Sequence, residues 1–143
     1  MRVFLDANVL FAAAISPEGR SAALFVLAER RACTLLTSAH ARTEARRNLE
    51  GRYPDALDRF EHLTHRVTIV PEAAPPRVGW ARQQRVPDED APILAAAVDA
   101  GADVLVTGDR SHFGHLFGRT LEGVRVLGLA QTLILVVEQR GRG

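Results

Sequence analysis

The chain has 143 residues, of which 47% are hydrophobic and 24% charged, and its formal net charge is +1. This length predicts a single domain spanning residues 1–143, large enough to bury a core without disulfides or structural metals. The balanced charge gives no global nucleic-acid signature, and the absence of lysine among eighteen basic residues excludes phosphoryl-transfer folds that require one.

Apolar runs and helical periodicity alternate along the chain, as is typical of α/β proteins. Five apolar runs predict strands, at residues 2–6, 34–37, 67–70, 103–107 and 124–127. The intervals predict helices, at residues 8–14, 20–31, 39–50, 55–64, 77–85, 91–100 and 128–139. Because the strands are apolar throughout, we expect a mostly parallel sheet of about five strands with helices on both faces. We also expect Ser38 to cap the third helix and the tail 140–143 to fray.

Neither a disulfide nor a membrane segment is expected. The single cysteine, Cys33, precedes an apolar run and is better explained as a packed thiol than as a reactive one. Strand residues begin directly after Arg2, so we expect no secretory signal. The most apolar stretch, 127–137, is interrupted by polar residues and is shorter than the ~20 residues that cross a bilayer. These features predict a cytoplasmic protein.

Two of the predicted strands end on an aspartate, one at Asp6 and the other, after Thr107 and Gly108, at Asp109. An aspartate at such a position is also common as a turn residue or helix cap. Asp6, however, stands between two apolar segments, where an unpaired buried charge would be costly. Since ligands bind at the carboxyl ends of strands in open α/β sheets, we predict that both acids belong to one site.

An acidic group precedes the most apolar helix. Asp88, Glu89 and Asp90 come just before Pro92, and proline is tolerated only in the first helical turn. Asp90 therefore lies at or next to the helix N-cap, where capping alone would explain an aspartate. Alternatively, Asp88 is the cap and Asp90 projects into the site. From the residues alone we favour a functional role for Asp90, but not for Asp88 or Glu89.

A group of neighbouring acids predicts a bound cation. Carboxylates within a few ångströms repel one another and resist ionisation unless a cation is present. Mg²⁺ or Mn²⁺ is the natural partner of such oxygen ligands, and ions held by acids support phosphodiester hydrolysis. No spacing rich in histidine or cysteine supports zinc. His112 and His115 are expected to be surface or loop residues, with contact to substrate as the less favoured alternative.

With these residues in place, the chain resembles the PIN-domain family, and in particular the VapC-like ribonuclease toxins of prokaryotic toxin–antitoxin pairs. The resemblance covers nearly the whole chain and rests on the order and spacing of four segments. These are Leu5-Asp6-Ala7-Asn8-Val9-Leu10, Glu44 after Thr37-Ser38, Asp90-Ala91-Pro92-Ile93-Leu94-Ala95-Ala96-Ala97, and Val106-Thr107-Gly108-Asp109. It implies a three-layer α/β/α sandwich around the central sheet.

The resemblance also implies an acidic quartet that holds Mg²⁺ or Mn²⁺, formed by Asp6, Glu44, Asp90 and Asp109. Glu44 taken alone would be explained as a solvated charge at the border of a packed helix face, so its inclusion depends on the resemblance. Asn8 and Thr107 match the polar residues that accompany the quartet, and Asp88 is grouped with them as an outer residue.

The function that the resemblance implies is a metal-dependent endoribonuclease acting on single-stranded or looped RNA, as the toxin of a toxin–antitoxin pair. A cognate antitoxin and a homodimer are the expected assemblies, with apolar residues of the early helices as a candidate dimer surface that core packing would also explain. The alternatives are a PIN-like nuclease that processes RNA or DNA, and a catalytically idle PIN module that binds a partner. The presence of all four acids argues against the idle module.

Arginines on the helix that carries Glu44 are candidates for RNA contacts. Arg42, Arg46 and Arg47, with Arg52 beyond them, give this helix a basic side that would hold phosphates. A solvated charged face explains them equally well. If the RNA interpretation holds, Arg46→Ala is expected to weaken binding and to flatten its salt dependence.

Overall fold

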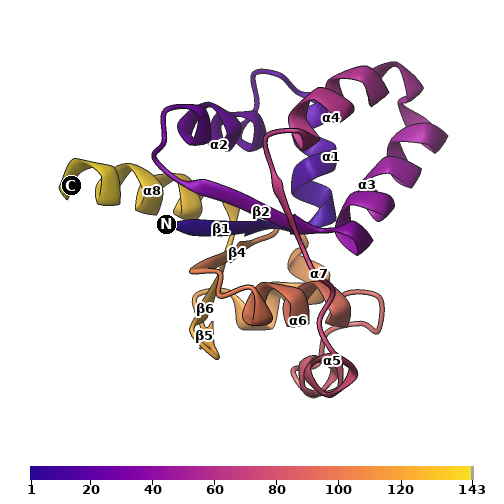
Figure 1. The fold of residues 1–143 in the computed structure, drawn as a ribbon, viewed down its shortest axis with the longest axis vertical. Coiled ribbons are helices and arrows are strands. Elements are labelled where there is room, and N and C mark those ends of the chain that lie inside the picture. Colours follow the sequence, from indigo (N-terminus) through magenta and orange to yellow (C-terminus); the bar gives the residue numbers. More distant parts are fainter. Residues whose placement is uncertain (143) are drawn as a thin grey trace.

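The computed structural model describes residues 1–142, which form a six-stranded sheet flanked by helices (Figure 1). The strands are β1 (Arg2–Leu5), β2 (Thr34–Ser38), β3 (Thr68–Val70), β4 (Val104–Val106), β5 (Thr120–Leu121) and β6 (Val124–Leu127). Their order in the sheet is β3-β2-β1-β4-β6-β5, and every neighbouring pair is parallel except β5 with β6. The predicted α/β class with a mostly parallel sheet is therefore confirmed.

Helices cover both faces of this sheet. They are α1 (Ala7–Ile15), α2 (Arg20–Glu29), α3 (Ala39–Arg52), α4 (Leu57–Thr64), α5 (Pro75–Arg82), α6 (Ala91–Asp99), α7 (Arg110–Phe113) and α8 (Leu129–Arg142), with 3₁₀ turns at Pro54–Ala56 and Gly114–Leu116. Helices α1 to α4 lie together on one side of the sheet, and α5 and α6 pack against each other on the opposite side (Figure 1). Helix α8 packs against α2 and β4.

The centre of the sheet is almost completely buried, which explains why its strands are apolar throughout. Val3, Phe4 and Leu5 of β1 have no exposed surface, and all of β4 is buried. Leu5 pairs with Val106, so the carboxyl ends of the parallel strands β1 and β4 lie side by side. The aspartates that follow these strands are consequently brought to one place.

Besides α7 and the two 3₁₀ turns, which the sequence does not predict, three segments differ from the prediction. β5 was not predicted, because a two-residue strand has no periodic signal. It is formed by a tight hairpin whose turn residues Glu122 and Gly123 have φ values of 49° and 86°, the geometry that matches the twist of paired strands. Helix α5 begins at Pro75, where the sequence predicts a loop, because proline is accepted at the first helical position. The final helix is expected to end at residue 139, but α8 continues to Arg142.

Two further predictions concern the burial of the single cysteine and the absence of a membrane-spanning helix. Cys33 is buried, and burial raises the pKa of its thiol, as expected for a packed and unreactive group. Within residues 1–142, no helix taken singly has the length and apolar character needed to span a bilayer. Helices α1 and α2 meet that test only when counted together, across a bend of 93°.

Replacing Thr37 with valine is expected to lower the free energy of unfolding by about 1 kcal/mol, and the melting temperature by about 2–4 °C. Thr37 on β2 is fully buried, and its Oγ1 donates a 2.8 Å hydrogen bond to the carbonyl of Leu5 on β1. Valine keeps the shape but removes the donor. Thr68→Val, at an exposed position of β3, is the matched control for thermal unfolding. Equal stability of the two variants would contradict a structural role for the Thr37 hydroxyl.

Candidate functional site

Asp6 directly follows β1 and occupies the N-cap of α1. Its side chain is only 2% exposed. Its Oδ1 accepts a hydrogen bond from the N–H of Ala7 at 2.7 Å. Its Oδ2 accepts two more, from Oγ1 of Thr107 at 2.7 Å and from Nδ2 of Asn8 at 3.0 Å. Three hydrogen bonds therefore fix this carboxylate at the end of the central strand.

Asn8 and Thr107 also join the end of β1 to the end of β4. Oγ1 of Thr107 accepts from the N–H of Asp109 at 3.1 Å, and Oδ1 of Asn8 accepts from the N–H of Gly108 at 2.8 Å. A Cβ added at Gly108 would lie 3.4 Å from this Oδ1, an ordinary van der Waals contact. The structure thus places both polar residues that the sequence associates with the acids in direct contact with Asp6 or its neighbours.

Glu44 and Asp90 bring two further carboxylates to Asp6. Glu44 lies on α3, whose N-terminus is capped by Oγ of Ser38 as the sequence predicts. Asp90 occupies the N-cap position of α6, but its side chain makes no capping hydrogen bond, so its carboxylate is left for the site. Asp6, Glu44 and Asp90 each offer an oxygen, and these oxygens lie within 4.8 Å of one another. We call these three residues the acid cluster.

The acid cluster resists ionisation, as expected for crowded carboxylates without a cation. Burial raises the pKa of Asp6, although the hydrogen bonds from Thr107, Ala7 and Asn8 oppose this effect. Burial and then the charge of Asp6 raise the pKa of Glu44. The same two causes, in the same order, raise the pKa of Asp90 to about 6. A cation bound among these oxygens would favour their charged forms.

Asp109 lies beside the acid cluster and caps α7. Its Oδ1 accepts hydrogen bonds from Oγ of Ser111 at 2.7 Å and from the N–H of His112 at 3.0 Å. Although burial opposes the effect, these hydrogen bonds help to lower the pKa of Asp109. Asp109 lines the same cavity as the acid cluster, but it is not one of the three residues whose oxygens lie within 4.8 Å.

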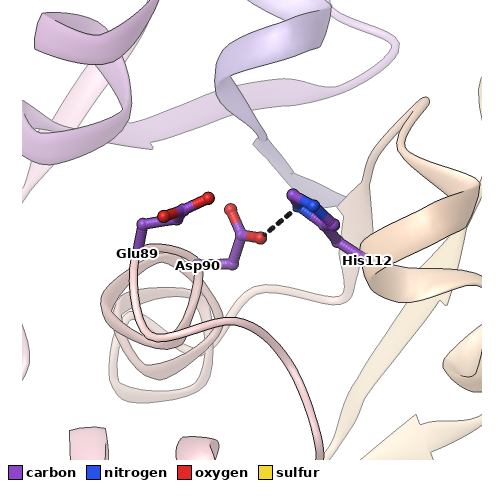
Figure 2. A group of neighbouring side chains, drawn as sticks. All are labelled: Glu89, Asp90 and His112. Carbon is purple, nitrogen blue, oxygen red and sulfur yellow. Dashed lines mark ion pairs between the residues drawn. The ribbon is translucent and has the colours of Figure 1, made fainter.

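His112 belongs to the site, although the sequence predicts it as a surface or loop residue. Its Nδ1 lies 2.7 Å from Oδ2 of Asp90 (Figure 2) and 2.9 Å from Oδ2 of Asp109. Desolvation lowers its pKa, but the charges of Asp90 and Asp109 outweigh this and raise it. Glu89, Asp90 and His112 also offer ligand atoms within 4.8 Å of one another. The sequence missed His112 because the four-residue α7 is too short to give a periodic pattern.

Two adjoining cavities open over these residues. One, of about 310 Å³, is lined by all four predicted acids together with Asn8, His112, Asn48 and Arg52. The other, of about 590 Å³, is more open and runs along α3, sharing Glu44, Asn48 and Glu89 with the first. Asn48 and Arg52 lie one and two helical turns beyond Glu44. The sequence points to Arg52 as part of the basic side of α3 but misses Asn48, which the i, i+4 spacing would have found.

The remaining predicted residues lie outside the acid cluster. Asp88 is exposed, and its carboxylate lies 3.6 Å from Nε of Arg82 rather than near the other acids. Arg47 lines the larger cavity, whereas Arg42 lines neither. Arg46 turns toward carboxylates on α3 and α4, with contacts of 3.3 Å to both Glu50 and Glu61.

Comparisons with solved structures agree with this architecture. VapBC2 from Rickettsia felis, bound to a promoter DNA fragment, is similar with a TM-score of 0.69 and 16% identity, covering 90% of this chain and 98% of that one. PAE2754 from Pyrobaculum aerophilum is similar with a TM-score of 0.67 and 19% identity, covering 96% and 99%. VapC20 from Mycobacterium tuberculosis, a sarcin–ricin loop cleaving toxin, gives 0.59 and 15%, covering 84% and 97%. At these identities the similarity establishes the fold.

Sequence comparison identifies the family directly. No curated protein sequence matches the chain. The family model of the PIN domain, however, matches residues 2–111, which include all four predicted acids as well as Asn8 and Thr107. This match covers well over half of the sequence, and the chain therefore belongs to the PIN-domain family.

Proposed function

We propose that this chain is a divalent-metal-dependent endoribonuclease that hydrolyses RNA phosphodiester bonds as the toxin of a toxin–antitoxin pair. The observation that carries the proposal is the acid cluster, whose three oxygens lie within 4.8 Å of one another at the carboxyl edge of a PIN-domain sheet. Such a concentration of raised-pKa carboxylates in a cavity is typical of a functional site rather than of a structural one.

The donor set of the acid cluster suits Mg²⁺ or Mn²⁺. Both ions prefer carboxylate oxygens and retain several waters, and the cavity over the cluster leaves room for them. Oδ2 of Asp90 is buried and lies 2.7 Å from Nδ1 of His112. A cation bound at the acid cluster would share this oxygen with His112 or use the other oxygen of Asp90. When bound, such an ion activates water and neutralises charge that develops on the phosphate.

In this proposal the residues around the acid cluster orient its carboxylates and balance their charge. Asn8 and Thr107 hold Asp6 in one orientation, so that the geometry of the acid cluster is set before substrate arrives. His112, with its raised pKa, lies between Asp90 and Asp109 and reduces their mutual repulsion. Asp109 completes the acidic lining of the cavity.

The toxin role and its partners rest on likeness of fold. VapBC2 and VapC20, to which this chain is similar in structure, support a toxin with a cognate antitoxin. A homodimer belongs to the same proposal, and the exposed Ile15 and Val26 on α1 and α2 offer it an apolar surface. A small reading frame next to the gene would support the toxin role over a role in RNA or DNA processing.

The test of the proposed activity is cleavage of RNA by the purified chain in Mg²⁺ or Mn²⁺, with EDTA and Asp109→Asn as controls. We expect cleavage that requires the metal and that is strongly reduced in the variant. Cleavage that persists in EDTA would point to a contaminant or a different site. No cleavage, together with no metal binding by calorimetry, would favour a module that works by binding a partner.

Arg47→Gln is expected to lower the slope of RNA affinity against salt concentration by about 0.7, the value for one phosphate contact on a single strand. Arg47 lines the cavity beside Glu44, where a phosphate next to the scissile one would lie. Arg46→Gln is the matched control, and it should change the slope less because Glu50 and Glu61 already neutralise its guanidinium. In this proposal Arg47, rather than Arg46, makes the phosphate contact. A larger change of the salt slope for Arg46→Gln than for Arg47→Gln in binding titrations would contradict the proposal.

A further inference from the structure

The C-terminal end of α3 places an arginine against two aromatic rings. The guanidinium carbon of Arg52 lies 5.7 Å from the centroid of the Phe11 ring and 5.6 Å from that of the Tyr53 ring. The two rings pack edge to face with their centroids 5.7 Å apart. Phe11 comes from α1 and Tyr53 directly follows α3, so the group joins two elements that pack side by side. We call these three residues the aromatic platform.

The aromatic platform is continuous with the candidate active site. Phe11 and Arg52 line the cavity of about 310 Å³ that also contains the acid cluster. Arg52 and Tyr53 line a further open cavity of about 390 Å³, which contains no member of the acid cluster and whose lining includes Asp55 and Arg59. Arg52 is therefore the residue shared by both cavities. A polymeric ligand that extends from the acid cluster along α3 would pass over Arg52.

The cation of Arg52 is not neutralised by a neighbouring acid. Arg46, Arg66, Arg77 and Arg82 each lie within 4.0 Å of a carboxylate, whereas within residues 1–142 no carboxylate lies that close to Arg52. Its cation–π contacts to the rings hold the guanidinium in place, but they neither neutralise its charge nor occupy its N–H donors. The charge and the donors of Arg52 thus remain available to an anionic ligand.

Tyr53 packs against Phe11 and Arg52 but leaves part of its ring exposed to solvent. Tyr53 is 43% exposed. Phe11, in contrast, is partly buried and packs against the core, which explains it without a ligand. If the group served only to join α1 to α3, Phe11 and the aliphatic part of Arg52 would suffice, and the exposed ring of Tyr53 would be left unexplained.

We infer that the aromatic platform binds a nucleobase of single-stranded RNA, with the base stacked on Tyr53 and the adjoining phosphate held by Arg52, next to the bond positioned at the acid cluster. This inference rests on the proposed function for its choice of RNA. Proteins that bind single strands combine aromatic faces for the bases with cations for the backbone. Because every base has a π-face, the aromatic platform positions the strand without selecting a sequence.

The test compares two dye-labelled single strands by fluorescence anisotropy in Mg²⁺, namely a 12-nucleotide oligouridylate and an abasic ribose-phosphate chain of the same length. All proteins carry Asp90→Asn, so that the strand is not cut during the titration. We expect the oligouridylate to bind about tenfold more tightly than the abasic chain, the size of one or two stacking contacts. Tyr53→Ala should remove most of this preference, and Tyr53→Phe should keep it.

The arginine variants separate stacking from charge. Arg52→Gln should lower the salt slope by about 0.7 for both strands, and Arg52→Lys should restore the slope but not the full affinity for the oligouridylate. Arg119→Gln removes the same charge from an exposed position near β5 and should change neither quantity. Tyr53→Leu provides a second variant if Tyr53→Ala lowers the melting temperature.

Three outcomes would overturn the inference. These are equal affinity for the two strands, equal weakening of both strands by the Tyr53 variants, and no binding of either strand. The proposed function fails separately, because it depends on cleavage by the wild-type chain and not on the ratio of two affinities. Cleavage without base preference would refute the aromatic platform alone, and base preference without cleavage would refute the nuclease alone.

Discussion

Asp6→Asn is expected to reduce metal-dependent RNA cleavage by more than about 100-fold. Residues that only orient a metal ligand already change metal affinity or activity by about 10- to 100-fold when mutated, and Asp6 is proposed as a ligand itself. Asp6 is the member of the acid cluster that the fold holds most firmly. Asparagine offers a neutral oxygen in place of a charged carboxylate and so binds a hard cation poorly. The measurement is the initial rate of RNA cleavage at saturating Mn²⁺.

The effect of the same substitution on stability is expected to be small. Removing the charge relieves the cost of burying it, which favours a fold at least as stable as the original. Oδ2 of Asp6, however, accepts hydrogen bonds from both Asn8 and Thr107, and an amide nitrogen in its place accepts neither. The two effects oppose each other, so we expect the free energy of unfolding in EDTA to change by about 1 kcal/mol or less. Unfolding of the variant would show that Asp6 is structural, and would remove the anchor of the proposed site.

The second large effect concerns divalent ions and pH together. Mn²⁺ at about 100 times its dissociation constant should stabilise the folded chain by about 2.7 kcal/mol at pH 7. Without metal, the site should make the protein less stable as the pH rises. Asp90 has a pKa of about 6 in the folded protein against 3.8 in the unfolded chain, so the folded state binds more protons between these values and loses that advantage above them. The raised pKa of His112 acts in the same direction at higher pH.

The measurement is the melting temperature in EDTA and in Mn²⁺ at pH 5 and pH 8, for the wild type and for Asp90→Asn. The variant lacks the titrating carboxyl and also removes the negative charge beside His112, so its pH dependence in EDTA should be smaller than that of the wild type. Its response to Mn²⁺ should be smaller too. Identical pH profiles for the two proteins, or a melting temperature of the wild type that does not respond to Mn²⁺, would contradict a metal site at the acid cluster.

The sequence predicted those parts of the site that are set by regular structure. Asp6 was visible because a charge interrupts an apolar run, and Asp90 because proline marks the first turn of its helix. The choice between capping and facing the site could not be made for Asp90, since it depends on side-chain orientation, and the structure shows no capping hydrogen bond. Glu44 looked like an ordinary surface charge, because its place in the site comes from the packing of α3 against α1 rather than from its own helix.

Residues on short or irregular elements were less predictable. The position of His112 depends on α7, which is only four residues long, and β5 depends on a two-residue turn. Arg46 and Arg47 are adjacent in the sequence and have similar sequence surroundings. Arg46 nevertheless contacts Glu61 on α4, whereas Arg47 lines a cavity. Only the relative placement of the helices separates them.

The central position of β1 has a consequence for the order in which the molecule is made. During synthesis β1 cannot pair with β4 until about a hundred further residues have been made, and Asp6 cannot meet Thr107 before then. Synthesis proceeds at roughly 5–20 residues per second, so the roughly eighty residues between Asp6 and Asp90 take several seconds to appear. The acid cluster therefore cannot form before Asp90 has been synthesised, so the proposed activity depends on a nearly complete chain.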